Sequence, residues 1–316
     1  MNEIFRAILL AACVFAVSAI AQDPDDVVRI ETQLIPFEVS VSDKNGNPVK
    51  DLKAGDFKII EDGSERRVDF FQPIVKSDAG RPLSIVFALD VSGSMTPQEM
   101  ERLHGAMQMF IGRLADFNSY FAVTAFGMHV RTVQGFTNRP DKLKKTFDRL
   151  AGDSDGLSTH AYDAIDDAIR MIATKSPPKM NGRIPKRAVI VVTDGFPVGD
   201  VVAPATVIER ANNAQTSIYS VILPSFSPLQ RTNKPLPTLL EVSGLIERTG
   251  GKTFYATDKN FEELFRSLAE EITSSYAIAF YPSEPNRNGG KFHAVKIEST
   301  KGYLVKQNRT GYKDKP

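Results

Sequence analysis

The sequence predicts an α/β protein, with a doubly wound, mostly parallel sheet and a smaller β-sandwich-like domain made from the two ends of the chain. Three observations predict this fold class. Between residues 82 and 274, apolar runs typical of buried strands alternate with segments of helical spacing. The flanking segments, residues 22–76 and 275–316, contain short strand-like runs separated by turn signals. The length of 316 residues favours one large domain plus a smaller one.

The first 21 residues predict a signal peptide. Arg6 precedes an apolar run over residues 7–17, and Ala21 ends a stretch of small residues suited to cleavage. The run is too short to predict a membrane span, so we expect an exported protein, periplasmic or secreted, with no transmembrane span in its mature chain. Cleavage after Ala21 would remove the sole cysteine, Cys13. Lipid anchoring at Cys13 stays open as an alternative, because residues 10–13 resemble a lipoprotein cleavage box.

The N-terminal β segment is expected over residues 22–76. Phe37, Val39 and Val41 alternate with polar residues, which predicts a half-buried strand with Glu38 on its polar face. Turn signals follow this strand. Further strands are expected over residues 57–60 and 68–71, turns over residues 44–47 and 61–64, and a linker over residues 77–81.

The central region, residues 82–274, predicts alternating strands and helices. Its strands are expected over residues 84–89, 120–126, 187–193, 217–223 and 251–255. Its helices are expected to begin at Thr96 and to cover residues 142–150, 161–173, 202–214, 236–248 and 260–274. Apolar residues from Met100 to Leu114 recur at helical spacing and predict a core-facing stripe. Parallel sheets of this kind bind ligands at the carboxyl ends of their strands.

The C-terminal segment, residues 275–316, returns to β structure. Strands are expected over residues 276–281, 292–298 and 303–306, with a turn cluster over residues 285–290. Neither terminal segment has enough strands for an independent sheet of good stability. We therefore expect the two segments to pair into one sandwich-like domain beside the central one.

Oxygen-bearing side chains stand where two predicted strands end and where one helix begins. They are Asp90, Ser92 and Ser94 after one apolar run, Thr159 before a helix, and Asp194 after a second apolar run. Hard divalent cations prefer several oxygen ligands with few charges among them. Each piece also has an ordinary interpretation: a tight turn around Ser92, a helix cap by Thr159, and a plain turn at Asp194.

In this order and context, the Asp-x-Ser-x-Ser run with a distal Thr and a distal Asp-Gly resembles the metal-ion-dependent adhesion site of the von Willebrand factor type A domain. The resemblance covers residues 82–274 and implies a Rossmann-like doubly wound sheet. The layout also resembles a bacterial exported family related to this domain, in which β segments like residues 41–63 and 276–285 flank the metal domain.

The resemblance implies a metal centre that recognises a protein. The implied ligands are Asp90, Ser92, Ser94, Thr159 and Asp194, and the implied ion is Mg²⁺, with Mn²⁺ and Ca²⁺ as alternatives. Ser92, Ser94 and either Thr159 or Asp194 would bind directly, and the other carboxylates through water. A partner protein would fill the open coordination position with an Asp or Glu carboxylate. In the family, binding can be linked to a shift of the last helix.

Nearby polar residues have simpler interpretations. Asp153 and Asp155 precede Thr159 and are expected to be exposed loop acids, although a role near the ion stays open. His160 is expected to be structural. The loop over residues 224–237 either flanks the site or only connects two elements.

Composition and motifs exclude several function classes. A formal net charge of +1 gives no electrostatic reason for nucleic-acid binding. The run Gly250–Thr253 imitates the end of a phosphate loop, but Ile246 stands where its first Gly should fall, so no nucleotide is expected. No nucleophile elbow surrounds Ser92, and none of the four histidines lies in a base context.

The sequence therefore predicts an exported, non-enzymatic, metal-dependent protein-binding or adhesion module. Two alternatives stay open. One is a structural scaffold of the cell envelope with a stabilising ion. The other is a metal-assisted hydrolase, in which the ion would activate water without an evident general base.

Overall fold

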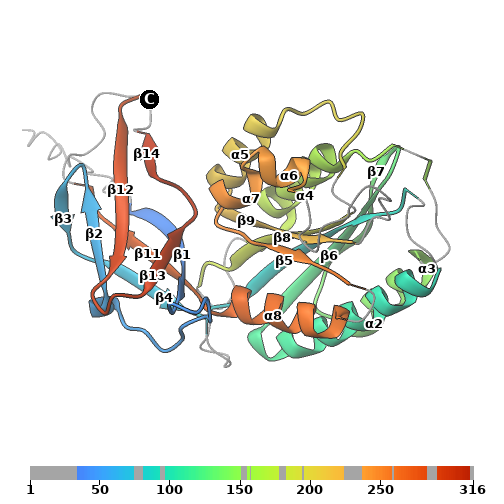
Figure 1. Ribbon diagram of the computed structural model, residues 1–316, viewed down its shortest axis with the longest axis horizontal. Coiled ribbons are helices and arrows are strands. Elements are labelled where there is room, and N and C mark those ends of the chain that lie inside the picture. Colours follow the sequence, from blue (N-terminus) through green and yellow to red (C-terminus); the bar gives the residue numbers. More distant parts are fainter. Residues whose placement is uncertain are drawn as a thin grey trace, which may run out of the picture. The chain divides into compact units, whose positions relative to one another are not determined.

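The computed structural model describes residues 34–74, 81–92, 97–150, 155–156, 158–177, 183–193, 196–223, 237–257, 260–282 and 290–313. These residues belong to one compact unit, Leu34–Pro316. Figure 1 shows its helices and strands. The predicted signal peptide with Cys13, most of the linker and most of the loop over residues 224–237 lie outside the described residues. The boundaries 1–21, 22–76, 82–274 and 275–316 stay predictions.

A six-stranded, mostly parallel sheet forms the centre of the α/β part and confirms the predicted fold class. Its strand order is β10-β9-β8-β5-β6-β7, and β7 runs antiparallel to its neighbour β6. The strands are β5 (Leu83–Asp90), β6 (Ser119–Phe126), β7 (Val130–Thr137), β8 (Lys186–Thr193), β9 (Thr216–Ile222) and β10 (Thr253–Tyr255). β5 is paired in parallel with β6 on one side and β8 on the other, so its carboxyl end lies in the middle of the sheet edge.

Two sets of helices cover the two faces of this sheet (Figure 1). One face carries α2 (Pro97–Leu114), α3 (Pro140–Leu150) and α8 (Phe261–Thr273), with the short 3-10 helix η2 (Ala115–Phe117) after α2. The other carries α4 (Ala161–Lys175), α5 (Pro204–Asn213), α6 (Leu239–Val242) and α7 (Leu245–Arg248). Ile85 and Phe87 of β5 pack in the first core, and Val86 and Ala88 in the second. Burial on both faces explains why this strand is apolar throughout.

The two ends of the chain form two small antiparallel sheets around a third core. The sheets have the orders β13-β1-β11-β4 and β14-β12-β2-β3. Their elements are β1 (Ile35–Ser42), η1 (Ala54–Asp56), β2 (Phe57–Glu61), β3 (Ser64–Arg66), β4 (Phe70–Pro73), β11 (Ser275–Phe280), β12 (Phe292–Ser299), β13 (Leu304–Gln307) and β14 (Gly311–Lys313). β1 pairs with β11, and β2 with β12, so both sheets combine the two chain ends. The predicted pairing of the terminal segments is confirmed.

A buried ion network joins the sandwich to the amino-terminal ends of β5 and β8. The carboxylate of Glu38 in β1 accepts two hydrogen bonds from the Arg81 guanidinium, one of them 2.9 Å long, and Arg81 lies just before β5. The ammonium group of Lys186, the first residue of β8, lies 3.4 Å from Glu38 Oε2 and donates to the Ser217 hydroxyl at 2.9 Å. Burial alone would raise the pKa of Glu38, but Arg81 and Lys186 lower it overall.

Some elements differ from the sequence predictions. The half-buried strand around Glu38 is buried on both faces at this residue, because the polar face of β1 meets Arg81. The single helix expected over residues 236–248 is two short helices, since Gly244 adopts a left-handed conformation with φ 74° between them. The strands β3, β7 and β14 were not predicted. β7 forms one edge of its sheet and lacks a clear alternation of buried and exposed residues.

Candidate functional site

Backbone hydrogen bonds tie three segments together at the carboxyl ends of β5 and β6. The Val91 N–H, just after β5, donates to the Phe126 carbonyl at 2.8 Å. The Val91 carbonyl accepts from Asp155 at 2.9 Å, and the Asp155 carbonyl accepts from Met128 at 2.7 Å. The turn between β6 and β7 and the loop before α4 are therefore fixed against the end of β5.

The loop before α4 continues between two further segments. The His160 N–H donates to the Gly127 carbonyl at 3.2 Å, on the side of the β6–β7 turn. Thr159 and Val198 form a reciprocal antiparallel bridge, with N–O distances of 3.2 and 2.9 Å. Thr159 thus lies between the turn after β6 and the loop after β8. No local sequence pattern predicts this bridge.

Asp90, the last residue of β5, has a buried carboxylate with neutral partners. Its side chain is 1% exposed. Oδ1 accepts a hydrogen bond from the Ser92 N–H at 2.9 Å, and Oδ2 accepts one from the Thr193 hydroxyl at 2.7 Å. Among the residues that the structure describes, no Lys, Arg or His side chain pairs with this carboxylate. A buried negative charge without a positive partner is unfavourable unless a cation balances it.

Two of the predicted ligands, Ser92 and Thr159, are nearly buried residues at the same edge of the sheet. Ser92 is 7% exposed and Thr159 is 6% exposed. Neither hydroxyl makes a hydrogen bond within the described parts of the chain. The interpretation of Thr159 as a helix cap is wrong, because the N-cap of α4 is His160 and the backbone of Thr159 pairs with Val198 instead. Both hydroxyls keep their acceptor capacity.

The other two predicted ligands, Ser94 and Asp194, lie outside the described residues. Asp194 directly follows Thr193, the last residue of β8. Ser94 lies between Ser92 and the first residue of α2, Pro97. The five-residue ligand set therefore stays a prediction.

The described residues fit a hard divalent cation. Asp90 provides a buried carboxylate with one negative charge, and no described basic side chain pairs with it. Ser92 and Thr159 provide two hydroxyl oxygens that make no hydrogen bond to a described residue. Mg²⁺ prefers oxygen ligands and is commonly held by only one or two carboxylates. Asp90, Ser92 and Thr159 would be the described part of its binding site.

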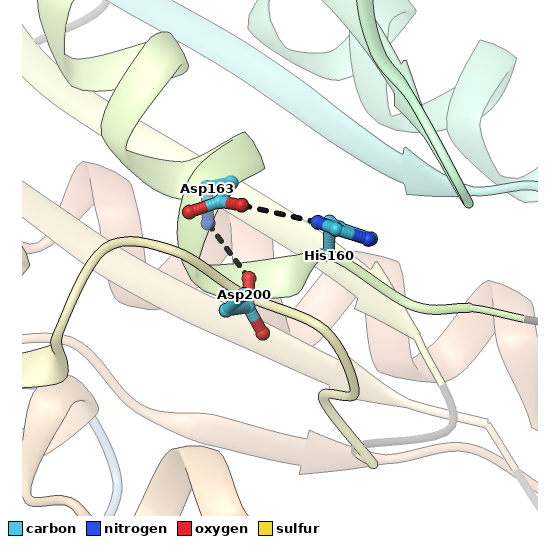
Figure 2. A group of neighbouring side chains, drawn as sticks. All are labelled: His160, Asp163 and Asp200. Carbon is cyan, nitrogen blue, oxygen red and sulfur yellow. Dashed lines mark hydrogen bonds and ion pairs between the residues drawn. The ribbon is translucent and has the colours of Figure 1, made fainter.

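A second group, His160, Asp163 and Asp200, has donor atoms within 4.8 Å of one another, close enough for one ion. Figure 2 shows that His160 and Asp200 both approach Asp163 in the first turn of α4. His160 Nδ1 lies 3.1 Å from Asp163 Oδ2, and the Asp163 N–H donates to Asp200 Oδ1 at 2.9 Å. The Asp163 carboxylate also accepts from the N–H groups of Val201 and Val202 at 2.8–3.0 Å.

These contacts attach the loop after β8 to the first turn of α4. Burial alone would raise the pKa of Asp163, but the backbone donors Val202 and Val201, together with His160, lower it overall. Burial raises the pKa of Asp200, and the neighbouring Asp163 charge adds to the rise. The Asp163 oxygens are already used by protein donors, so the group holds the loop beside Thr159 in place. This supports the structural interpretation of His160.

Asp155 is also engaged by the protein. Its carboxylate accepts from the His129 N–H at 2.7 Å and lies 3.2 Å from His129 Nδ1. The His129 backbone and side chain lower the pKa of Asp155. The interpretation of Asp155 as a simple exposed loop acid is therefore incomplete, because this carboxylate fixes the β6–β7 turn. Asp153 lies outside the described residues.

Comparison with known proteins identifies the α/β part. The sequence profile of the von Willebrand factor type A domain matches residues 84–272, more than half of the chain. No curated protein matches the chain. Within the described residues, no helix is both long and apolar enough to cross a membrane.

Several solved structures have a similar fold at low sequence identity. BatB from Bacteroides thetaiotaomicron is 19% identical, with a TM-score of 0.44, and the match covers 60% of this chain and 97% of BatB. The von Willebrand domain of the type V pili tip protein Mfa5 from Porphyromonas gingivalis is 12% identical, with a TM-score of 0.46, over 61% and 95%. Proximal thread matrix protein 1 from the mussel byssus, in a structure with a zinc-occupied MIDAS motif, is 15% identical, with a TM-score of 0.49, over 66% and 50%.

Proposed function

The chain belongs to the von Willebrand factor type A domain family, and we propose that it is an exported protein that binds a partner through a divalent metal ion. The ligands would be Asp90, Ser92, Ser94, Thr159 and Asp194, and the ion Mg²⁺, with Mn²⁺ and Ca²⁺ as alternatives. The partner would be a protein that presents an Asp or Glu carboxylate. Export is inferred from the predicted signal peptide over residues 1–21.

The observation that carries this proposal is the environment of Asp90. Its carboxylate is buried, its two hydrogen-bond donors are neutral, and no described basic side chain pairs with it. Proteins pair buried charges or use them to bind metals, because an unbalanced buried charge is strongly disfavoured. The hydroxyls of Ser92 and Thr159 at the same edge add oxygen donors without adding charge. A divalent cation satisfies all three groups.

The charge balance of these ligands favours recognition over a purely stabilising ion. A cation held mainly by neutral hydroxyls keeps a strong attraction for a further anionic ligand, and a partner carboxylate supplies that ligand. A stabilising ion would instead be enclosed by protein carboxylates. The site also lacks a described residue placed as a general base, since His160 and His129 are each paired with an aspartate. We therefore rank a binding protein above both an envelope scaffold and a metal-assisted hydrolase.

Isothermal titration of Mg²⁺ and Mn²⁺ into the chelator-stripped mature chain, residues 22–316, tests the metal centre. We expect one site in the wild type and none in the Asp90→Asn or Asp194→Asn proteins. Asp167→Asn is the matched control, because Asp167 is an exposed residue of α4 that lies beyond the loop carrying Thr159. It should bind the ion as the wild type does.

Two results would contradict the proposal. Equal ion affinity in the wild type and in a folded Asp90→Asn protein would remove Asp90 from the site. If the folded wild type bound no ion, the chain would share only the fold of its family, and a metal-free scaffold would be favoured. Circular dichroism of each variant separates loss of the site from loss of the fold.

A further inference from the structure

We infer that the partner carries its carboxylate within an apolar segment, because exposed apolar side chains gather on the segments beside Thr159. This inference rests on the proposed function and specifies the partner's chemistry. We call these side chains the apolar collar: Met128, Phe196, Val198, Val201, Leu239 and Val242. They account for six of the eleven large apolar side chains that are exposed in the described residues.

The collar side chains are substantially exposed, from 49% for Met128 to 87% for Val201. An exposed apolar side chain that occurs singly is ordinary on a protein surface. A group of them on adjacent loops is typical of a surface that another molecule covers. The remaining exposed apolar residues are distributed over the sandwich, α2 and the segment before β8.

Hydrogen bonds place the collar segments around the loop that carries Thr159. Met128 lies on the β6–β7 turn, and its N–H donates to the Asp155 carbonyl at 2.7 Å. Its side chain packs against Gly156, because a Cβ added at Gly156 would lie 3.0 Å from the Met128 methyl carbon. Val198 is bridged directly to Thr159. The N–H of Val201 donates to the Asp163 carboxylate in the first turn of α4.

The helix α6 adds two further collar residues, Leu239 and Val242, next to the start of α4. The Tyr162 hydroxyl donates to the Leu239 carbonyl at 2.9 Å. Tyr162 follows Thr159 by three residues, so Leu239 lies close to the loop of the proposed ion. Val242 ends the same short helix and is 70% exposed. Three elements separate in sequence thus contribute apolar surface to one edge of the sheet.

The charged groups on these segments offer little to a polar partner. Asp155 is paired with His129, and Asp163 with His160 and two backbone N–H groups. Asp200 accepts from the Asp163 N–H. Selectivity on this surface would therefore come from apolar contact, while the ion provides attraction for the carboxylate.

The arrangement on both sides of Thr159 specifies the kind of partner segment. The β6–β7 turn with Met128 lies on one side of residues 159–160, and the loop with Val198 lies on the other. A peptide chain whose carboxylate reaches the proposed ion would place its preceding and following residues over these two segments. We therefore assign as partner an exposed peptide segment in which Asp or Glu is flanked by Leu, Ile, Val, Phe or Met.

A displayed heptapeptide library with a fixed central Glu tests this assignment. The mature chain is immobilised in Mg²⁺, and bound peptides are eluted with chelator. We expect apolar residues to be enriched on both sides of Glu relative to the starting library, and a matched library with central Gln to give no enrichment. Selected peptides should bind the Met128→Ser/Val198→Ser/Val201→Ser protein at least about tenfold more weakly, as expected when several apolar contacts are lost.

Control measurements separate this inference from the proposed function. The matched control is Ile184→Ser/Phe292→Ser/Leu304→Ser, which removes exposed apolar side chains away from the collar and should bind the peptides as the wild type does. Mg²⁺ titration should give one site in both triple variants. Two results would overturn the inference and leave the proposed function standing. One is enrichment that depends on Glu but shows no preference for apolar neighbours. The other is equal affinity of the selected peptides for the wild type and for the Met128→Ser/Val198→Ser/Val201→Ser protein.

The other outcomes are equally decisive. A bound ion without any chelator-eluted peptide would contradict a carboxylate partner and with it the collar assignment. Failure of the wild type to bind Mg²⁺ in the titration would contradict the proposed function itself. Apolar enrichment that is equally strong in chelator would identify a metal-independent apolar surface and overturn the assignment.

Discussion

Buried charged groups lie near both ends of the central strands β5 and β8, and the two ends differ in whether an opposite charge is present. At the amino-terminal end, Arg81 and Lys186 both meet the Glu38 carboxylate inside the protein. At the carboxyl end, the Asp90 carboxylate meets only the Ser92 N–H and the Thr193 hydroxyl among the described residues. The amino-terminal end contains its own counter-charge and is called the closed end; the described residues of the carboxyl end contain none, and it is called the open end.

This difference indicates which end of the sheet serves binding. In the buried network, each charged group already has a partner of opposite charge, so a further ligand would add little stability there. A buried carboxylate with neutral donors gains stability from any cation that can reach it. The two ends should therefore respond with opposite signs when their acidic residue is neutralised, and that contrast can be measured.

The largest effect is expected at the closed end. Glu38→Gln would leave Arg81 and Lys186 buried with no carboxylate between them, and loss of one partner of a buried pair typically destabilises by about 3–5 kcal/mol. Urea unfolding of the metal-free protein measures this change. Glu65→Gln, which removes the exposed ion pair with Lys58, is the control and should leave the unfolding free energy almost unchanged, because solvent screens this pair.

A small change in Glu38→Gln would contradict the comparison. It would mean that the backbone carbonyls of Ile184 and Pro185, which also accept from Arg81, are sufficient to satisfy the buried guanidinium.

The second effect is expected at the open end. In chelator, Asp90→Asn should raise the unfolding free energy by about 1 kcal/mol, because the unbalanced charge disappears while the amide oxygen still accepts from Ser92. In Mg²⁺ at a hundred times its dissociation constant, the wild type should gain about 2.7 kcal/mol and the variant nothing. Thermal unfolding of both proteins in chelator and in Mg²⁺ checks this. Destabilisation of the variant in chelator would show that Asp90 is balanced within the protein.

The sequence predicted the open end better than the closed end, and the reason is physical. Asp90 and Thr159 belong to local patterns, a strand followed by a turn and a loop followed by a helix, so their spacing carries information. Glu38 and Arg81 are 43 residues apart, and Glu38 and Lys186 are 148 apart, so neither pair has a local signature. The alternation in β1 placed Glu38 on a polar face, but nothing in it indicated that Arg81 covers that face.

The same distinction explains the errors in the elements. The buried strands β5 and β8 are apolar on both faces and were predicted almost to their ends. The edge strand β7 carries exposed polar residues, and its existence depends on pairing with β6. The bridge between Thr159 and Val198 depends likewise on tertiary structure. Ser94 and Asp194 stay predictions from their motif alone.

The third effect is a pH dependence of the unfolding free energy that arises from Glu38 at the closed end. The pKa of Glu38 in the folded protein is below its ordinary value of 4.5. The network therefore contributes stability that is fully present above pH 4.5 and is lost as pH falls through the folded pKa, where the unfolded chain binds one more proton. Below pH 4.5, the stability of Glu38→Gln should fall less steeply than that of the wild type, by up to about 1.4 kcal/mol per pH unit.

Urea unfolding between pH 3 and pH 7 measures the two slopes. Parallel curves for the wild type and Glu38→Gln would show that Glu38 titrates alike in the folded and unfolded chains, which would contradict its pairing with Arg81 and Lys186.

The smallest effect concerns how far an ion at the open end influences the rest of the molecule. The helix α8 ends at Thr273, and after the single residue Ser274 the chain enters β11. β11 is hydrogen-bonded to β1 on one side and β4 on the other, so movement of α8 along its axis would disrupt two strand pairings. We therefore expect Mg²⁺ to slow amide hydrogen exchange in the loops around Thr159 and Val198 and to leave β11 unchanged. Faster exchange in β11 on adding Mg²⁺ would instead establish the helix shift that the family resemblance implies, and would connect the two ends of the sheet. With the expected result, the sandwich is a fixed support, and affinity is determined by the ion and the collar alone.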